Sequence, residues 1–486
     1  DKEFNFYAFH IPTQKNEFIA NLGKEIQERG KISSIVHYHN SYFVGFLMDG
    51  ILLLEKQKET NHYQIQPLPI NSGVFCLKKD RFQDVVWIGT DGQGVYLYSN
   101  PLYSIKSMVL SNYTEKIERP VRAIYLDDER TFWVGTKGNG ILKIYDYEFD
   151  KNISDCRSEV LTTSNSALSS NAVYCFAKSH RNLLWIGDEE GLTYYSYREK
   201  RIKSIPIRMG NEDFKYIHDI YETADSELWL ASVGMGVVKA RIAGTPDNPV
   251  IVDAQRYVIN DGELGSNYFF TIYAENEANL LFGNKGYGVF RYNETTNGLE
   301  PVSTHKYENM TLNNILAIGK DSSNNYLFGT SYGLIKYTSE TSYQLFNAKN
   351  GFLNNTIHAI LRNSSDNFWL STNLGLINFD TKRNVFRSYG FGDGLKVVEF
   401  SDGAAFRDSR TGTLFFGGIN GVVAIRADGR PEQLYMPPVY FDKLSIFGEQ
   451  YNLGEFLTRK KETEVLNLQY DQNFFSVSFA SVDYLN

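Results

Sequence analysis

One sequence pattern recurs nine times along the chain and constrains the fold more than any other feature. Each copy has an aromatic or apolar pair, a small residue, a short turn with glycine and a second apolar stretch, as in TFWVGTKGNGILKI and NYLFGTSYGLIKY. The small residues that anchor the copies are Gly45, Gly89, Gly135, Gly187, Ala231, Gly283, Gly329, Ser371 and Gly417. They are 42 to 52 residues apart, and each interval holds four segments of strand length. Such a period is typical of a β-propeller blade.

All five tryptophans lie inside this pattern, each two residues before an anchoring residue. They are Trp87, Trp133, Trp185, Trp229 and Trp369. A large apolar ring at this point is expected to fill the space between neighbouring blades, and the small residue to allow close backbone approach. These positions are therefore interpreted as packing positions.

The composition narrows the function classes. A net charge of −8 without a Lys/Arg run argues against nucleic acid as a partner. No stretch reaches the roughly 18 apolar residues needed to span a bilayer. The start, DKEFNFYAFH, lacks an initiator Met and a signal peptide, so we expect either a processed chain or a fragment.

The few other local signals are weaker. Cys76 and Cys175 lie in apolar strand-like runs and are expected to be buried thiols, although one disulfide among these two and Cys156 stays open. Residues 19–30 have helical spacing and a terminal glycine, which predicts a short helix.

The repeats stop after Ala427, where a linker with Pro431, Pro437 and Pro438 begins. The following stretches PPVYFDKLSIFGE and QNFFSVSFASVDYLN are interpreted as strands without the blade pattern. They predict the start of a β-sandwich at 437–486, which is too short to be complete.

The LWIGT-type repeats followed by PPVYF and NFFSVSFASVDY resemble two-component regulator propeller repeats and the start of the three-tyrosine domain. This order resembles the periplasmic sensor region of hybrid two-component systems in glycan-degrading bacteria. The resemblance implies two seven-bladed β-propellers, an immunoglobulin-like β-sandwich, a membrane helix and a cytoplasmic histidine kinase. It also implies a periplasmic homodimer that is anchored in the inner membrane only through segments outside this sequence.

The resemblance implies seven blades in a complete propeller, and we count these back from Gly417. The chain is then expected to be all-β and to have three parts. We expect a seven-bladed propeller at 113–430, the last blades of a preceding, incomplete propeller at 1–112, and the start of the sandwich at 437–486. Five blades of the preceding propeller and the tyrosine triad are not visible in this sequence. The kinase motifs are also not visible here.

Two loop sets of a propeller share one face, which is the usual ligand site of the fold. Amides, hydroxyls and aromatic rings in these loops suit sugar hydroxyls and ring faces, and the basic residues suggest an acidic glycan. The alternative is that many of these residues only form turns. The loop candidates are Arg119, Lys137, Asn139, Lys215, Tyr216, Tyr268, Lys285, Tyr287, Tyr332 and Asn373.

One register of the inner strands carries polar residues thirteen positions before the anchors. It holds Arg122, Tyr174, His218, Phe270, Leu316 and His358, of which the first three and His358 are candidate ligand-binding residues. The two histidines are three blades apart and are expected to face each other across the ring. A third metal ligand at suitable spacing is not found, so histidines satisfied by hydrogen bonds between blades are favoured over a metal site.

The leading hypothesis is a sensor module that binds an oligosaccharide and transmits a conformational change to a histidine kinase. The chain itself is expected to have no enzymatic activity, no cofactor and no metal. The alternatives are a propeller-type polysaccharide lyase or glycosidase, and a protein-interaction scaffold, because the fold alone does not choose between them.

Overall fold

The structure is a computed structural model, and its residues divide into two compact units. One unit is Tyr103–Asp428, and the other comprises Asp1–Leu102 and Gly429–Asn486. The residues that the structure describes are 2–56, 62–99, 103–112, 117–259, 267–302, 310–339, 341–427, 439–460, 463–481 and 484. The linker prolines Pro431, Pro437 and Pro438 lie outside them.

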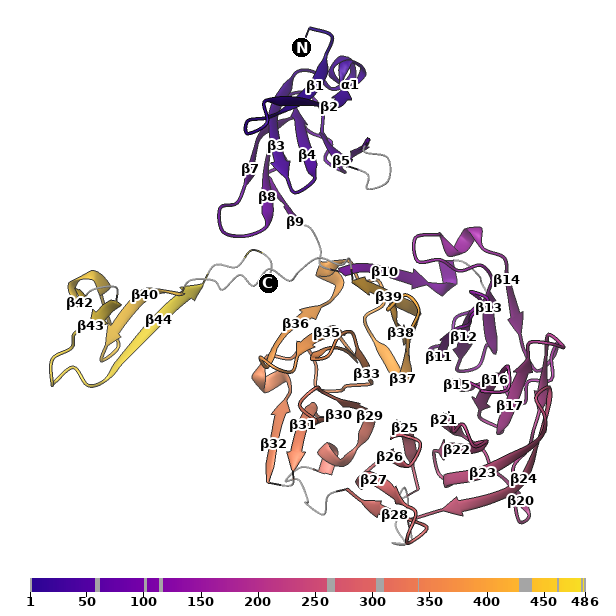
Figure 1. Cartoon of the computed structure of the whole chain (residues 1–486). Helices are drawn as coiled ribbons and strands as arrows, with labels where there is room; N and C mark the ends of the chain where they lie inside the picture. Colours follow the sequence, from indigo (N-terminus) through magenta and orange to yellow (C-terminus); the bar gives the residue numbers. More distant parts are fainter. Residues whose placement is uncertain are drawn as a thin grey trace. The chain divides into compact units, whose positions relative to one another are not determined.

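The unit Tyr103–Asp428 is a ring of four-stranded antiparallel sheets (Figure 1). Six sheets use strands that follow one another in the chain. The first three are β11 (Val121–Leu126), β12 (Phe132–Thr136), β13 (Ile141–Ile144) and β14 (Ser158–Leu161); β15 (Val173–Lys178), β16 (Leu183–Asp188), β17 (Leu192–Ser196) and β18 (Arg201–Ser204); and β21 (Ile217–Glu222), β22 (Glu227–Ser232), β23 (Gly236–Thr245) and β24 (Asn248–Tyr257). The next three are β25 (Phe269–Asn276), β26 (Asn279–Asn284), β27 (Gly288–Asn293) and β28 (Gly298–Pro301); β29 (Ile315–Lys320), β30 (Tyr326–Thr330), β31 (Leu334–Ser339) and β32 (Ser342–Phe346); and β33 (Ala359–Arg362), β34 (Asn367–Thr372), β35 (Gly375–Asp380) and β36 (Val385–Tyr389).

A seventh sheet closes the ring with strands from both ends of the unit. Its order is β10 (Tyr103–Val109), β39 (Gly421–Ala427), β38 (Leu414–Gly418) and β37 (Phe400–Arg407). The innermost strand of each sheet packs against the innermost strand of the next, in the order β11, β15, β21, β25, β29, β33 and β37. β37 in turn packs against β11. The expected range 113–430 omitted β10, because this strand carries no copy of the repeat.

The anchoring residues are small because the next sheet approaches them closely. A Cβ added at Gly135 would lie 2.8 Å from Val173, and one at Gly417 would lie 2.6 Å from Val121. In each case the neighbour is the first residue of the next inner strand. The tryptophans of β12, β16, β22 and β34 are at most 1% exposed, whereas Trp87 is partly exposed. The packing interpretation of these positions is confirmed for these four rings.

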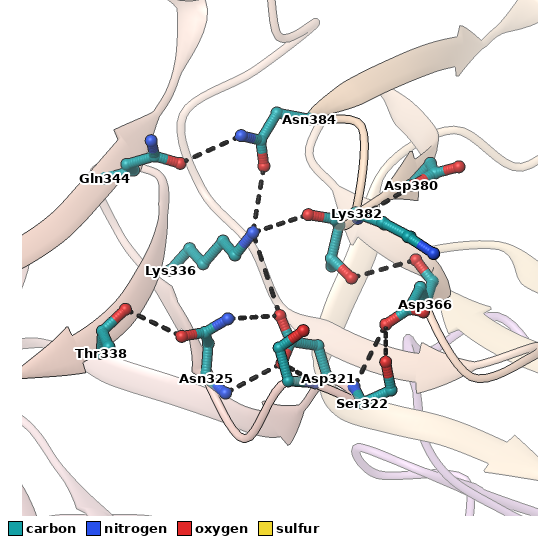
Figure 2. A network of polar contacts seen from close by, with 12 residues as sticks. Asp321, Ser322, Asn325, Lys336, Thr338, Gln344, Asp366, Asp380, Lys382 and Asn384 are labelled. Carbon is teal, nitrogen blue, oxygen red and sulfur yellow. Dashed lines mark hydrogen bonds and ion pairs between the residues drawn. The ribbon is translucent and has the colours of Figure 1, made fainter.

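Polar networks also join neighbouring sheets of the ring (Figure 2). The Lys336 amine on β31 donates to the Thr381 carbonyl oxygen at 2.6 Å and to the Asn384 side chain at 3.2 Å, both in the turn between β35 and β36. It also lies 3.9 Å from the buried Asp321 carboxylate of its own sheet. Because the amine is largely buried, these contacts fix the relative position of the two sheets.

Residues 2–56 and 62–99 form three sheets and one helix. Hairpin β1 (Asn5–His10) and β2 (Lys15–Asn21) precedes helix α1 (Gly23–Arg29), which confirms a helix within 19–30 although residues 19–21 belong to β2. A four-stranded and a three-stranded sheet follow, formed by β3 (Ile32–Tyr38), β4 (Ser41–Phe46), β5 (Ile51–Lys56) and β6 (Tyr63–Pro67), and by β7 (Val74–Lys79), β8 (Val85–Thr90) and β9 (Val95–Ser99).

The cysteine predictions have mixed outcomes. All three thiols are free, and Cys175 is buried as expected, with its sulfur 3.6 Å from the Ile217 carbonyl oxygen of the next sheet. The prediction for Cys76 is wrong, because this side chain is exposed on β7. The next inner strand, β21, packs against β15 and covers Cys175, whereas β7 packs against the preceding inner strand, β3.

The C-terminal part of the unit that contains the first 102 residues has two small antiparallel sheets in its described residues. β40 (Val439–Ile446) pairs with β41 (Glu449–Tyr451) and β44 (Phe475–Ser481), and β42 (Leu457–Lys460) pairs with β43 (Thr463–Leu466). The other helical elements of the described residues are short 3-10 helices at Leu110–Asn112, Ile153–Asp155, Met310–Asn313, Ala348–Asn350, Phe391–Asp393 and Leu453–Glu455. In the ring unit, the short strands β19 (Arg208–Met209) and β20 (Glu212–Asp213) form a separate hairpin. In the described part of the chain, no helix is long and apolar enough to cross a membrane.

Candidate ligand-binding channel

The register of polar residues found in the sequence lines the centre of the ring. In five inner strands the pairing with the next strand shifts at the second residue, for example between Val121 and Ala123, which leaves Arg122 outside the regular ladder. Such bulges redirect a side chain away from the sheet faces. The five bulged residues are Arg122, Tyr174, His218, Phe270 and Leu316.

The bulged side chains line a cavity of about 200 Å³. His358, directly before β33, completes the lining on the sixth sheet, and Gly403 and Ala405 contribute from the seventh. The shift in β37 is wider and runs from Phe400 to Ala405, so Asp402 takes the place that a single bulged residue takes elsewhere. Counting thirteen residues back from Gly417 gives Ala404, which is why the sequence pattern missed this carboxylate.

One side of the channel carries the charged groups. His358 Nδ1 lies 2.5 Å from Asp402 Oδ1, and Arg122 Nη1 lies 3.8 Å from Asp402 Oδ2. His358 Nε2 also lies 2.6 Å from the Asn373 side-chain oxygen. Asn373 is in the loop between β34 and β35, so the ring of side chains lies at the end of the channel where these loops gather.

The opposite side is aromatic and apolar. The Tyr174 and His218 rings stack with centroids 4.4 Å apart and an interplanar angle of 18°. Phe270 meets His218 edge to face at 5.6 Å, and Leu316 continues the apolar wall. The channel therefore combines hydrogen-bonding groups with ring surface, as small-molecule sites do.

Burial separates the pKa values of the ionisable groups. It lowers the pKa of His218 to about 3, with the Arg122 charge acting in the same direction, so this imidazole is neutral at pH 7. Burial acts to raise the pKa of Asp402, but the His358 hydrogen bond and the nearby cations outweigh it and hold that pKa below its usual range. Burial raises the pKa of Asp219 to about 6, although backbone N–H groups of Ile220 and Ile272 donate to its carboxylate.

The structure brings five of the predicted residues together, namely Arg122, Tyr174, His218, His358 and Asn373. The expected hydrogen bond of a histidine between blades is present for His358, which meets Asp402 of the next sheet. His218 instead makes ring contacts. Within the described ranges, no group of three or more His, Cys, Asp or Glu residues could hold a metal ion.

The remaining loop candidates lie outside this cluster and have local roles. The Asn139 side chain accepts from the Arg119 backbone N–H at 2.9 Å, and the Lys215 amine pairs with Glu190 at 2.5 Å. The Lys285 amine lies 5.9 Å from the centre of the Tyr268 ring. Lys137 and Tyr216 are exposed, and Tyr287 and Tyr332 pack partly against the core.

Cys175 is the thiol among the described residues that line the cavity. Burial raises the pKa of the Cys175 thiol, so its reactive thiolate form is disfavoured. Both ring nitrogens of His358 are engaged by neighbouring oxygens, which leaves no free nitrogen to act as a general base.

No protein-family model matches the sequence, and a search of the curated proteins finds no match. Solved structures do resemble the chain. It is 23% identical to an extracellular domain assigned to a hybrid two-component system of B. thetaiotaomicron, with a TM-score of 0.57 over 99% of this chain and 61% of that one. A second such domain from the same organism is 17% identical, with a TM-score of 0.53 over 98% of this chain and 63% of that one.

A third resemblance covers only part of the chain. It is to a catalytically inactive virginiamycin B lyase of Staphylococcus aureus, at 15% identity and a TM-score of 0.51, over 67% of this chain and 99% of that one. At these identities the likenesses show the β-propeller fold. The chain spans about three fifths of the length of the two sensor-system domains.

Proposed function

We propose that the chain is an extracytoplasmic ligand-sensing module of a two-component signalling receptor. The observation that carries this proposal is the likeness to extracellular domains of such systems over nearly the whole chain. This likeness includes the residues before and after the ring in the sequence. The lyase resemblance, by contrast, covers about two thirds of the chain. The compartment of the proposed receptor is the periplasm, and its partner is a histidine kinase encoded outside this sequence.

The proposed ligand is an oligosaccharide that binds at the loop end of the channel. The amide of Asn373 and the aromatic wall around Tyr174 offer hydrogen bonds and ring faces to a sugar. Binding would change signalling only if the ligand has different affinities for two arrangements of the receptor. We place that change in the arrangement of two protomers, with the 439–481 segment as the connection toward the membrane.

A propeller-type lyase is the second candidate, and the partial likeness to virginiamycin B lyase is the observation that favours it. It requires a base that can take a proton from substrate. The nitrogens of His358 are engaged by Asp402 and Asn373, and the neutral imidazole of His218, with a pKa of about 3, is a weak base. The sensor role therefore remains the preferred proposal.

Titration calorimetry of the full chain against a panel of neutral and acidic oligosaccharides, with product analysis of each mixture, tests the proposal. We expect saturable binding of at least one glycan without products. Release of shorter or unsaturated sugars would replace the sensor with the enzyme. Absence of binding across the panel would remove the oligosaccharide from the proposal.

A further inference from the structure

Arg122 is the largely buried cation of the channel, and its hydrogen-bonding capacity is not used by the fold. Its side chain is 14% exposed, and the Nε atom is buried without a hydrogen-bond partner in the described residues. The two contacts of the guanidinium are long, namely 3.8 Å from Nη1 to Asp402 Oδ2 and 5.9 Å from Cζ to the Tyr174 ring centre. A guanidinium has five N–H donors, and burying it without hydrogen bonds is costly.

The neighbouring acids have hydrogen-bond partners other than Arg122, although Asp402 Oδ2 faces its charge at 3.8 Å. Asp402 Oδ1 contacts His358 Nδ1 at 2.5 Å, and the Asp219 carboxylate accepts the backbone N–H groups of Ile220 at 2.9 Å and Ile272 at 2.7 Å. His218 is neutral because burial lowers its pKa to about 3. Arg122 is therefore the cation in the cavity whose donors remain available to a ligand.

The walls restrict the size and shape of that ligand. The cavity has a volume of about 200 Å³, which is the volume that about seven molecules occupy in liquid water. It is smaller than the ~300 Å³ at which pockets for drug-sized ligands begin. Phe270 and Leu316 provide apolar surface in the same cavity as Arg122. One sugar ring with a charged substituent fits this combination, because its C–H faces suit the apolar wall and its substituent suits the cation.

A carboxylate matches the cation in geometry as well as in charge. The planar fork of a guanidinium forms two parallel hydrogen bonds with the two oxygens of a carboxylate. We propose that the channel binds the uronic acid residue of an acidic oligosaccharide, with Arg122 holding its carboxylate and Phe270 and Leu316 contacting its ring. This inference rests on the proposed function, since it names the sugar class that the same site accepts.

The test compares D-glucuronate and D-galacturonate with glucose and galactose, which carry a hydroxymethyl group in place of the carboxylate, by calorimetry on the full chain. We expect at least one uronate to bind saturably and at least about 30-fold more tightly than its neutral counterpart, the effect of losing one desolvated charge pair. Arg122→Gln is expected to remove this preference. Arg241→Gln, which changes an exposed arginine of β23 outside the channel, should leave it intact.

A second variant keeps the test decisive if Arg122→Gln does not fold, as monitored by circular dichroism. Leu316→Trp fills the channel from its apolar side and leaves the arginine in the sequence, and it should abolish uronate binding. Equal affinity for uronate and neutral sugar, a uronate preference that survives Arg122→Gln, uronate binding that survives Leu316→Trp, or equal competition by acetate and sulfate would each overturn the inference. A neutral oligosaccharide that binds without any uronate preference would uphold the sensor proposal while overturning this one.

Discussion

His358 Nδ1 lies 2.5 Å from Asp402 Oδ1, across the boundary between the sixth and seventh sheets of the ring. The other ring nitrogen contacts Asn373 at 2.6 Å in a loop at the channel end. One side chain thus connects two blades and a candidate ligand loop. A ligand that displaces Asn373 would act directly on this junction.

The His358–Asp402 contact is expected to stabilise the ring. In a double-mutant cycle of His358→Ala and Asp402→Ala, we expect each single change to lower the free energy of unfolding by about 1–3 kcal/mol. The two losses should be coupled by about 1–2 kcal/mol, because each variant removes the same hydrogen bond. Urea unfolding followed by tryptophan fluorescence measures both quantities, and strictly additive losses would show that the contact contributes nothing.

The repeated blade could be predicted from the sequence because its packing residues recur at fixed spacing. A glycine such as Gly135 must be small wherever the next inner strand comes close, so the constraint is repeated in every copy. The inner-strand register was found for the same reason. Asp402 was missed because the bulge in β37 is longer than the others and moves the side chain out of the common spacing.

The neutral state of His218 predicts a specific pH dependence of stability. Its pKa is about 3 in the folded chain and about 6.5 when unfolded, so the unfolded state binds more protons between these values and stability falls as the pH drops below about 6.5. At pH 4 this one group costs about 3 kcal/mol relative to pH 8. Asp188 and Asp219, with pKa values raised to about 6 by burial, act in the opposite direction.

The variant His218→Phe isolates that contribution, because it keeps an aromatic ring beside Tyr174 and leaves both acids in place. Its free energy of unfolding should fall less than that of the parent between pH 7 and pH 4. Parallel pH curves for the two proteins would mean that His218 is not held neutral. Urea unfolding at several pH values provides the comparison.

The polar network between the fifth and sixth sheets should be a stability element (Figure 2). Lys336→Met removes the amine that reaches Thr381 and Asn384 and leaves the Asp321 carboxylate, which is 2% exposed, without its cation. We expect a loss of about 2–4 kcal/mol. Lys382→Met, an exposed lysine of the same turn, should change stability by less than about 0.5 kcal/mol, and equal effects of the two variants would contradict this assignment.

The closure of the ring depends on the pairing of β10 with β39, two strands separated by nearly the whole unit. A Cβ at Gly421 would lie 2.0 Å from the Met108 carbonyl oxygen, so Gly421→Ala should push these strands apart and cost more than about 2 kcal/mol. Gly298→Ala is the control, because the nearest atom to its added Cβ is 3.8 Å away. Equal thermal midpoints for the two variants would show that the closing pair contributes little.

The pairing of the closing strand β10 could not be predicted from the sequence. β10 carries neither a tryptophan nor an anchoring glycine, and its partner β39 lies more than 300 residues further along the chain. A repeat pattern contains no information about which distant strand completes the last blade. The same holds for the loop residues, since contacts such as Asn373 with His358 depend on positions that only the folded ring brings together.

Hydrogen–deuterium exchange with and without the tightest-binding oligosaccharide tests the central claim most directly, because it locates the ligand without assuming its chemistry. We predict slower exchange at the starts of β11, β15 and β21, around His358, and in the loop that carries Asn373. Protection confined to the outer strands β14, β18 and β24, or to 439–481, would contradict the account and move the ligand away from the channel.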